Sequence, residues 1–205
     1  DDNPQPHFMG SIVTSPARSV PEGVEKRLLI DGQQRLTTIL TLLALVRDMA
    51  REAGQSKTAS QIEDLYLTNR YENGNDFFKL LPTQGEDPAQ SDRETFTRVI
   101  RGEGGALNGD GGIAAAYKFF RNKLRRSDAP DIEALHRVIV GKLTLVSIIL
   151  DDKDNPHRIF ESLNGKGRPL TQADLIRNYF FMRIDEHEHD RTFVEFWRPM
   201  QKRLG

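Results

Sequence analysis

The sequence of 205 residues contains no cysteine and one tryptophan, and its charges nearly cancel, with 29 Lys and Arg against 30 Asp and Glu. The lack of cysteine excludes a disulfide framework, a thiolate metal site and a cysteine nucleophile. A net charge of -1 gives no bulk electrostatic reason to bind nucleic acid or a membrane, so a local patch must hold any such partner. The length and the 37% hydrophobic content predict one ordinary domain or two small ones.

Long apolar runs are also lacking. The longest apolar-leaning stretch, residues 36–46, is broken by three threonines and is shorter than the roughly 20 residues that span a bilayer. The first residues have neither the basic start nor the apolar middle of a signal peptide. We therefore expect a cytoplasmic protein without a membrane span, and we interpret residues 1–6 as a cut through a longer chain.

The spacing of apolar residues predicts an α+β fold. Strands are expected over residues 7–14 and 27–30, and a long, mostly apolar helix from Leu36 to near Gly54 should be central to the core. Residues 143–150 are expected to form a buried strand, and residues 76–81 a short one. Further helices are predicted over residues 61–70, 87–100, 113–126, 131–140, 156–163, 171–183 and 191–203.

The segment Asp31-Gly32-Gln33-Gln34-Arg35 stands where a strand ends and the long helix begins. The first N–H groups of a helix lack partners and lie at the positive end of its dipole, so this position attracts phosphate. Gly32 permits a tight turn, and Arg35 supplies a planar fork for phosphate oxygens. Gln33 and Gln34 add amide groups, and Asp31 can hold a divalent ion or orient water.

A purely structural interpretation of the same segment stays open at this point. Asp31 can be only an N-cap, Gly32 only a turn, and Arg35 the partner of a nearby acid.

A second polar segment lies near the end of the sequence. The turn from Asn164 contains Lys166, Gly167 and Arg168 and can wrap an anion with its backbone and its cations. On the predicted helix that follows, residues 174, 177, 178 and 181 form a mostly polar stripe. This stripe is either a solvated face or a phosphate or DNA contact, and Asp174 is equally well explained as part of a capping box with Thr171.

Two other polar clusters are weaker candidates for a functional site. The cations of residues 118–126 are more typical of a solvated helix face near its C-terminus than of a DNA contact. Residues 187–190, His-Glu-His-Asp, lack a fixed helical spacing, and we do not expect a metal site there.

The segment 29–38 resembles the DGQQR box of the GmrSD-type restriction endonuclease N-terminal domain, a relative of the ParB and sulfiredoxin nucleotide-binding fold. Residues 159–179 resemble the second motif of that family, with Gly165 where threonine is frequent, and residues 8–13 and 80–83 resemble two of its strands. The front domains of phosphorothioate-sensing defence effectors share this plan.

The resemblance implies a small ParB/sulfiredoxin-like mixed sheet with a large, mostly helical insertion and C-terminal helices. Residues 1–53 and 142–183 would form the nucleotide-binding core, whose N-terminal part we expect to be missing. Residues 54–141 would be the helical insertion, and residues 184–205 a C-terminal helix leading to an absent downstream domain.

The function that the resemblance implies is a nucleotide-binding and NTP-hydrolysing regulatory, DNA-sensing domain of a modification-dependent restriction endonuclease in anti-phage defence. The substrate would be GTP or ATP with Mg²⁺. The partners would be modified DNA and an HNH-type nuclease domain or subunit outside this chain. The resemblance is also compatible with an oligomer. Asp31, Gln34 and Arg35 would be catalytic. Nucleotide-binding positions would be Gly32, Gln33, Thr37, Thr38, Asn164, Lys166, Gly167, Arg168, Arg177 and Asn178.

Two other functions stay open on the sequence. One is a non-hydrolysing module that binds modified DNA through the polar stripe and the helix of residues 118–126. The other is a scaffold subunit that only docks other proteins.

Overall fold

The computed structural model describes residues 5–16, 24–82, 92–107, 111–126, 131–151 and 191–204, together with positions 154, 159, 180, 184 and 188. The chain divides into two compact units, one of residues 1–11 and 32–146 and the other of residues 12–31 and 147–205. Strands and helices are both present, so the predicted α+β class is confirmed. The boundaries drawn from the motifs stay a prediction.

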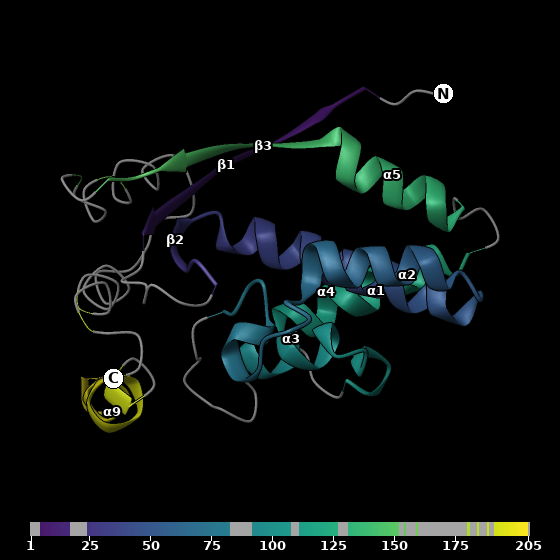
Figure 1. Ribbon diagram of the computed structural model, residues 1–205. Coiled ribbons are helices and arrows are strands. Elements are labelled where there is room, and N and C mark those ends of the chain that lie inside the picture. The colour runs from purple at the N-terminus through teal and green to yellow at the C-terminus, as the bar shows by residue number, and fades with distance from the viewer. Residues whose placement is uncertain are drawn as a thin grey trace. The chain divides into compact units, whose positions relative to one another are not determined.

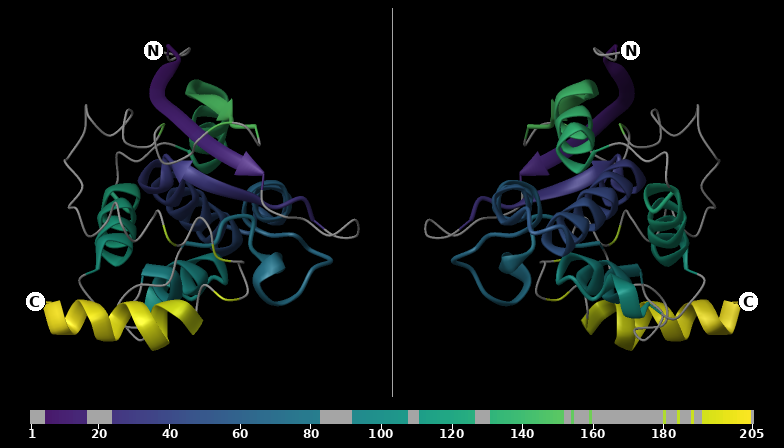
Figure 2. Two further views of the ribbon diagram at one scale, coloured as in Figure 1. Left: turned by 90° about the vertical axis from the view of Figure 1, so that its left-hand side faces the viewer. Right: turned by 90° about the vertical axis from the view of Figure 1, so that its right-hand side faces the viewer.

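The described strands form a three-stranded sheet in the order β2-β1-β3 (Figure 1). They are β1 (His7–Pro16), β2 (Arg27–Asp31) and β3 (Leu143–Ile149), close to the predicted strands. β1 and β2 are antiparallel, and their register shifts between Val13 and Thr14. Such a bulge bends a strand, and Figure 2 shows the curve of β1 along its length.

The third strand runs parallel to the first. The Thr144 hydroxyl donates to the His7 carbonyl, and the Leu150 N–H donates to the Thr14 carbonyl. Residue numbers therefore rise in the same direction along both strands, and the sheet is mixed, as expected.

The expectation that β3 is buried is wrong. Val146, Ile148 and Ile149 are exposed, and among residues 143–150 only Leu150, just after the strand, is fully buried. β3 is at the edge of the sheet, where a strand has a neighbour on one side only. An unbroken run of apolar residues does not distinguish an edge strand from a central one. Leu150 packs with Val13 and Ile30 in the small core of the second unit.

In the first unit, α1 (Gln33–Glu52) lies among the other helices (Figure 1). It contacts α2 (Ser56–Ile62), α3 (Asp92–Ile100), α4 (Gly112–Leu124) and α5 (Ile132–Lys142). Its buried residues run from Leu43 to Arg47 with Thr41 and Ala50, so the predicted central position is confirmed. The helix ends before Gly54, whose φ of 74° breaks the helical conformation.

The segment after α2 differs from the predictions in two places. The helix predicted over residues 61–70 begins at Ser56 and continues as the π-helical turn η1 (Glu63–Leu67). Residues 76–81 are not a strand, because the 3₁₀ turn η2 (Gly74–Phe77) includes part of them and only Phe78 forms a bridge, to Thr68. The Asn69 amide donates to the Asp76 carbonyl, which holds this turn closed.

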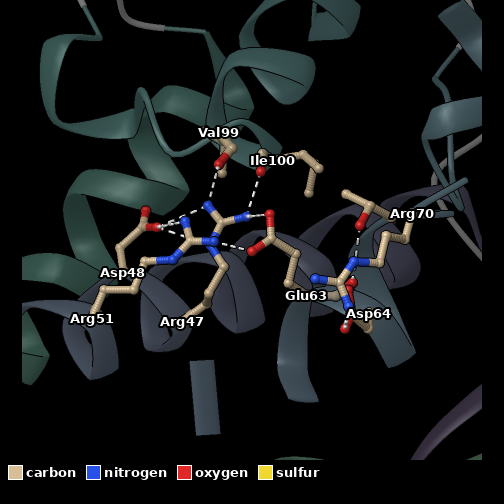
Figure 3. Close-up of polar contacts among 9 residues, drawn as sticks. Arg47, Asp48, Arg51, Glu63, Asp64, Arg70, Val99 and Ile100 are labelled. Carbon is tan, nitrogen blue, oxygen red and sulfur yellow. Dashed lines mark hydrogen bonds and ion pairs between the residues drawn. The ribbon is translucent and has the colours of Figure 1, made fainter. Parts of the chain in front are cut away.

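Arg47 is fully buried in the core of the first unit, with a relative exposure of 0% (Figure 3). Its guanidinium donates to the carbonyls of Val99 and Ile100, the last two residues of α3. It also forms an ion pair with Asp48 at 2.8 Å and lies 3.9 Å from a Glu63 oxygen. Burial raises the pKa of Asp48 above its usual 3.8, although Arg47 and Arg51 lower it, so desolvation outweighs the ion pairs.

The C-terminal segment is helical, as predicted for residues 191–203. A π-helical turn, η5 (Phe193–Trp197), continues directly into α9 (Arg198–Leu204). The helices predicted over residues 156–163 and 171–183 lie almost wholly outside the described residues. Within the described part of the chain, no helix combines the length and the apolar content that crossing a bilayer requires.

Candidate phosphate-binding site at the start of helix α1

The Asp31 to Arg35 segment forms a turn between β2 and α1. β2 ends at Asp31, Gly32 is the N-cap, and the helix begins at Gln33. Gly32 is buried and has a φ of 95° and a ψ of 9°, a left-handed conformation that favours glycine. The alternative in which Asp31 is the N-cap is therefore wrong, because the cap position belongs to Gly32.

The N-cap of α1 is a glycine, which has no side chain that could cap the helix. No side chain at the N-cap accepts a hydrogen bond from the first turn, and the first turn contains no acid. It contains Gln33, Gln34 and Arg35, the first two of them exposed. The first backbone N–H groups of this 20-residue helix lie at the positive end of its dipole, and neither the N-cap nor the first turn supplies a carboxylate to them.

Arg35 is half-buried and is held against β1. Its guanidinium donates to the Ser11 carbonyl. The side chain passes over Gly10, where a Cβ atom would lie 3.3 Å from Arg35 Nε. Gly10 has a φ of 108°, a conformation that favours glycine, and an added Cβ would also push the Arg35 side chain slightly away. A guanidinium has five N–H donors in a planar fork, and the bond to the Ser11 carbonyl ties this fork to β1.

The two threonines that follow the box have different environments. The Thr37 hydroxyl lies 2.8 Å from the Gln33 carbonyl and 3.1 Å from the Gln34 carbonyl, so its proton is directed at the helix itself. The side chain of Thr38 is exposed. Thr38 therefore offers its hydroxyl to the surface of the first two turns, and Thr37 serves the backbone of the helix.

The second predicted segment lies outside the described residues. This applies to Asn164, Lys166, Gly167, Arg168, Arg177 and Asn178. Their expected place beside the Asp31 to Arg35 turn stays a prediction.

Potential metal ligands do not cluster in the part of the chain that the structure describes. It contains no group of three His, Cys, Asp or Glu residues arranged to hold an ion. A hollow of about 350 Å³ is lined by residues of η5 and α9, including Phe196 and Met200. Neither of these residues belongs to the two motifs, so the hollow lies outside the predicted nucleotide-binding residues.

A comparison with protein families matches residues 1–181 to the model of the GmrSD restriction endonuclease, N-terminal domain. The chain belongs to this family. No curated protein matches the chain. Membership of a restriction endonuclease family suggests DNA as a partner and a nuclease domain as a functional companion of this GmrSD N-terminal domain.

The sequence interpretation missed Gly10 and Ser11 as parts of this site in the GmrSD N-terminal domain. Residues 8–13 were interpreted only as a strand, yet Gly10 makes room for Arg35, and Ser11 accepts its hydrogen bond. A glycine inside a strand pattern often marks a close approach of another group, and that signal was present. What the sequence could not supply was the identity of the group that approaches.

A nucleoside triphosphate with Mg²⁺ fits the residues of this turn in the GmrSD N-terminal domain. The helix start without an acid suits phosphate oxygens, and Arg35 suits their charge. One carboxylate, Asp31, is a small ligand set, but Mg²⁺ keeps several waters and commonly binds through one or two carboxylates and the substrate phosphates.

Proposed function

We propose that this domain binds and hydrolyses a nucleoside triphosphate and thereby regulates a modification-dependent restriction endonuclease that senses DNA. The proposal depends on one observation above all. A cation, Arg35, stands in the first turn of a helix whose N-cap is a glycine and whose first turn contains no acid.

Electrostatics explains why this arrangement favours an anionic ligand. A cation near a helix N-terminus faces the positive end of the dipole and is disfavoured by about 0.3 to 1 kcal/mol. A phosphate bound at the first turn reverses the sign of that interaction and accepts hydrogen bonds from the backbone N–H groups. Gly32 contributes through its conformation, because its φ of 95° makes the tight turn that starts α1 directly after β2.

The box residues would then have distinct roles in hydrolysis. Arg35 neutralises charge on the transferred phosphoryl group, and Asp31 and Gln34 orient the attacking water. The water oxygen bonds to the γ-phosphorus and its proton passes to a phosphate oxygen or to solvent, while the bond to the bridging oxygen breaks with its electron pair leaving on the nucleoside diphosphate. Mg²⁺, when bound with the nucleotide, lowers the charge of the phosphates.

The remaining predicted contacts complete the site in this proposal. Gln33 and Thr38 would contact phosphate or sugar from the exposed face of the helix. The turn of residues 164–168 would close over the phosphates with Lys166 and Arg168, and Arg177 and Asn178 would follow from the next helix. The DNA modification and the choice of GTP or ATP are properties that the assay below would determine.

The test is phosphate release from GTP and from ATP by the full-length protein, with and without modified DNA. We expect Asp31→Ala and Arg35→Ala to lower the rate by about 100-fold or more, since one electrostatic contact to the transition state contributes on that scale. Arg137→Ala, which removes an exposed cation on α5, is the matched control and should keep the rate. Equal rates in all three variants would exclude the proposal.

A further inference from the structure

A cationic face on α4 combines charge with an exposed aromatic ring. The stretch from Gly112 to Arg126 contains five cations and no acid, in a chain whose net charge is -1. Because the net charge of the chain is close to zero, a polyanion could bind only at a local positive patch, and this stretch provides one.

The inner face of α4 is fixed by the core. Ile113, Ala114 and Tyr117 are buried, and the Tyr117 ring packs so closely over Gly104 that a Cβ atom there would lie 2.5 Å from it. This packing determines which residues point outward.

The outer face carries the charge. Ala115, Lys118, Phe119, Asn122 and Lys123 follow the helical spacing i, i+3, i+4, i+7 and i+8, and all are exposed. Arg126, just beyond the end of the helix, is exposed as well. We name Lys118, Phe119, Lys123 and Arg126 the α4 face.

Phe119 distinguishes the α4 face from an ordinary solvated helix. Attraction of cations to a helix C-terminus explains lysines and arginines but not a phenylalanine with 56% exposure between them. Its ring makes an edge contact with Phe120 at 5.7 Å, and Phe120 packs against the core. The Lys123 ammonium lies 5.8 Å from the ring centroid, so the ring and the cation form one preordered surface.

The spacing of the cations suits a nucleic acid backbone. Lys118 and Lys123 are separated by about 8 Å along the helix axis, and one strand of duplex DNA carries a phosphate about every 3.4 Å along its axis. Insertion into a membrane would need more apolar surface than one exposed ring provides.

We propose that the α4 face is a DNA-binding surface, on which Lys118, Lys123 and Arg126 contact phosphates and Phe119 packs against the sugar or base edge. The proposal depends on the DNA-sensing part of the proposed function and is independent of the nucleotide site.

The test is fluorescence anisotropy of a labelled 20-bp duplex titrated with the full-length protein, without nucleotide, at several salt concentrations between 50 and 200 mM NaCl. We expect the triple variant Lys118→Ala, Lys123→Ala, Arg126→Ala to flatten the slope of log K against log salt by about 2.7, because each phosphate contact contributes about 0.9. Affinity at the lowest salt should fall about tenfold or more.

Two further variants make the measurement specific. Lys57→Ala, Arg70→Ala, Arg137→Ala removes the same number of exposed cations elsewhere on the first unit and should keep the wild-type slope. Phe119→Ala should weaken binding about fivefold or more without changing the slope, since an apolar contact with a sugar or base edge releases no counterions. Replacing the three cations by Lys or Arg of the same charge should keep the slope.

The outcomes separate the two proposals. Equal slopes for the two triple variants would overturn the α4 face and leave nucleotide hydrolysis untouched. Absence of DNA binding by the wild type at 50 mM NaCl would overturn both the α4 face and the DNA-sensing role. If polyglutamate displaces the duplex as well as unlabelled DNA does, the surface binds acidic protein and the proposal is wrong.

Discussion

Two arginines of α1, Arg35 and Arg47, lie beside glycines with positive φ, and their surroundings are opposite. Arg47 lies next to Gly102 and donates to the last carbonyls of α3, at the negative end of that helix dipole. Arg35 lies next to Gly10 and stands in the first turn of α1, at the positive end of its own helix dipole. The first arrangement stabilises the fold without a ligand, whereas in our proposal an added anion would stabilise the second.

Burial makes the same distinction. Arg47 has no exposed surface, and two carboxylates and two carbonyls surround it. Arg35 is half-buried, with the Ser11 carbonyl as a partner from the backbone of β1. We infer that Arg47 maintains the helical unit and that Arg35 binds the ligand.

The largest effect on stability is expected for Arg47→Met. This change keeps much of the apolar stem but leaves Asp48, Glu63 and two α3 carbonyls without their common donor. We expect a loss of about 3 to 5 kcal/mol in the free energy of unfolding, measured by urea denaturation. Arg51→Met, which removes a more exposed arginine with the same acidic partners, should lose about 1 kcal/mol or less. Equal losses would show that burial of Arg47 is not decisive.

Arg35→Ala should have the opposite profile. Nucleotide binding should weaken about 10-fold to 100-fold, because a hydrogen bond to a charged group contributes about 1.5 to 3 kcal/mol. The free energy of unfolding should change by about 1 kcal/mol or less, since the side chain is half-buried. Titration calorimetry and urea denaturation of the same sample test both parts, and a large stability loss with unchanged affinity would reverse the two roles.

Gly10→Ala tests whether the position of Arg35 matters for binding. A side chain at a φ of 108° is strained, and its Cβ would lie 3.3 Å from Arg35 Nε. We expect a stability loss of about 1 to 3 kcal/mol together with weaker nucleotide binding. Gly54→Ala is the control, because Gly54 also has a positive φ but no atom within 4 Å of the added Cβ. If both variants lose stability and neither binds nucleotide more weakly, Gly10 is not part of the nucleotide site.

The smallest effect concerns pH and the Arg47 network. Desolvation raises the pKa of Asp48 in the folded protein, and Arg47 is the strongest of the influences that lower it. Without Arg47 the pKa of Asp48 in the folded protein rises further above the unfolded value of 3.8. As pH falls, Asp48 of the folded variant therefore takes up a proton at a higher pH than Asp48 of the folded wild type, which stabilises the folded variant. The stability difference between wild type and Arg47→Met should therefore shrink between pH 7 and pH 5. A difference that stays constant or grows in urea denaturation would contradict this assignment.

Much of the fold could be predicted from the sequence where local periodicity decides it. The apolar repeat of α1, the helices α4 and α5, and the three strands of the sheet follow from spacing and β-branched composition. The exposure of β3 could not be predicted, because it depends on the position of the strand in the sheet. The π-helical turn after α2 and the 3₁₀ turn at residues 74–77 were also missed, since side-chain contacts such as Asn69 to Asp76 stabilise them.

The sequence predicted that residues 31–35 form a turn at the start of a helix, but it did not predict which residues this turn contacts. The glycine and the arginine of the box indicated a phosphate-binding helix start, and the structure adds Gly32 as the N-cap and Ser11 as a partner of Arg35. The contact between Arg35 and β1 joins residues 24 apart in sequence, which no local pattern encodes. The burial of Arg47 could likewise not be predicted from the apolar run that contains it, because the carbonyls and the Glu63 carboxylate that it contacts come from α3 and from η1.

Thermal unfolding of the full-length protein with and without Mg²⁺ and GTP or ATP tests the difference between the two arginines most directly. A ligand that binds the folded state raises the midpoint, by an amount that depends on its concentration relative to Kd. The wild type and the control Arg137→Ala should show the same rise with nucleotide, and Arg35→Ala should show little or none. An equal rise in Arg35→Ala and the wild type would contradict the assignment of the α1 N-terminus as the nucleotide site.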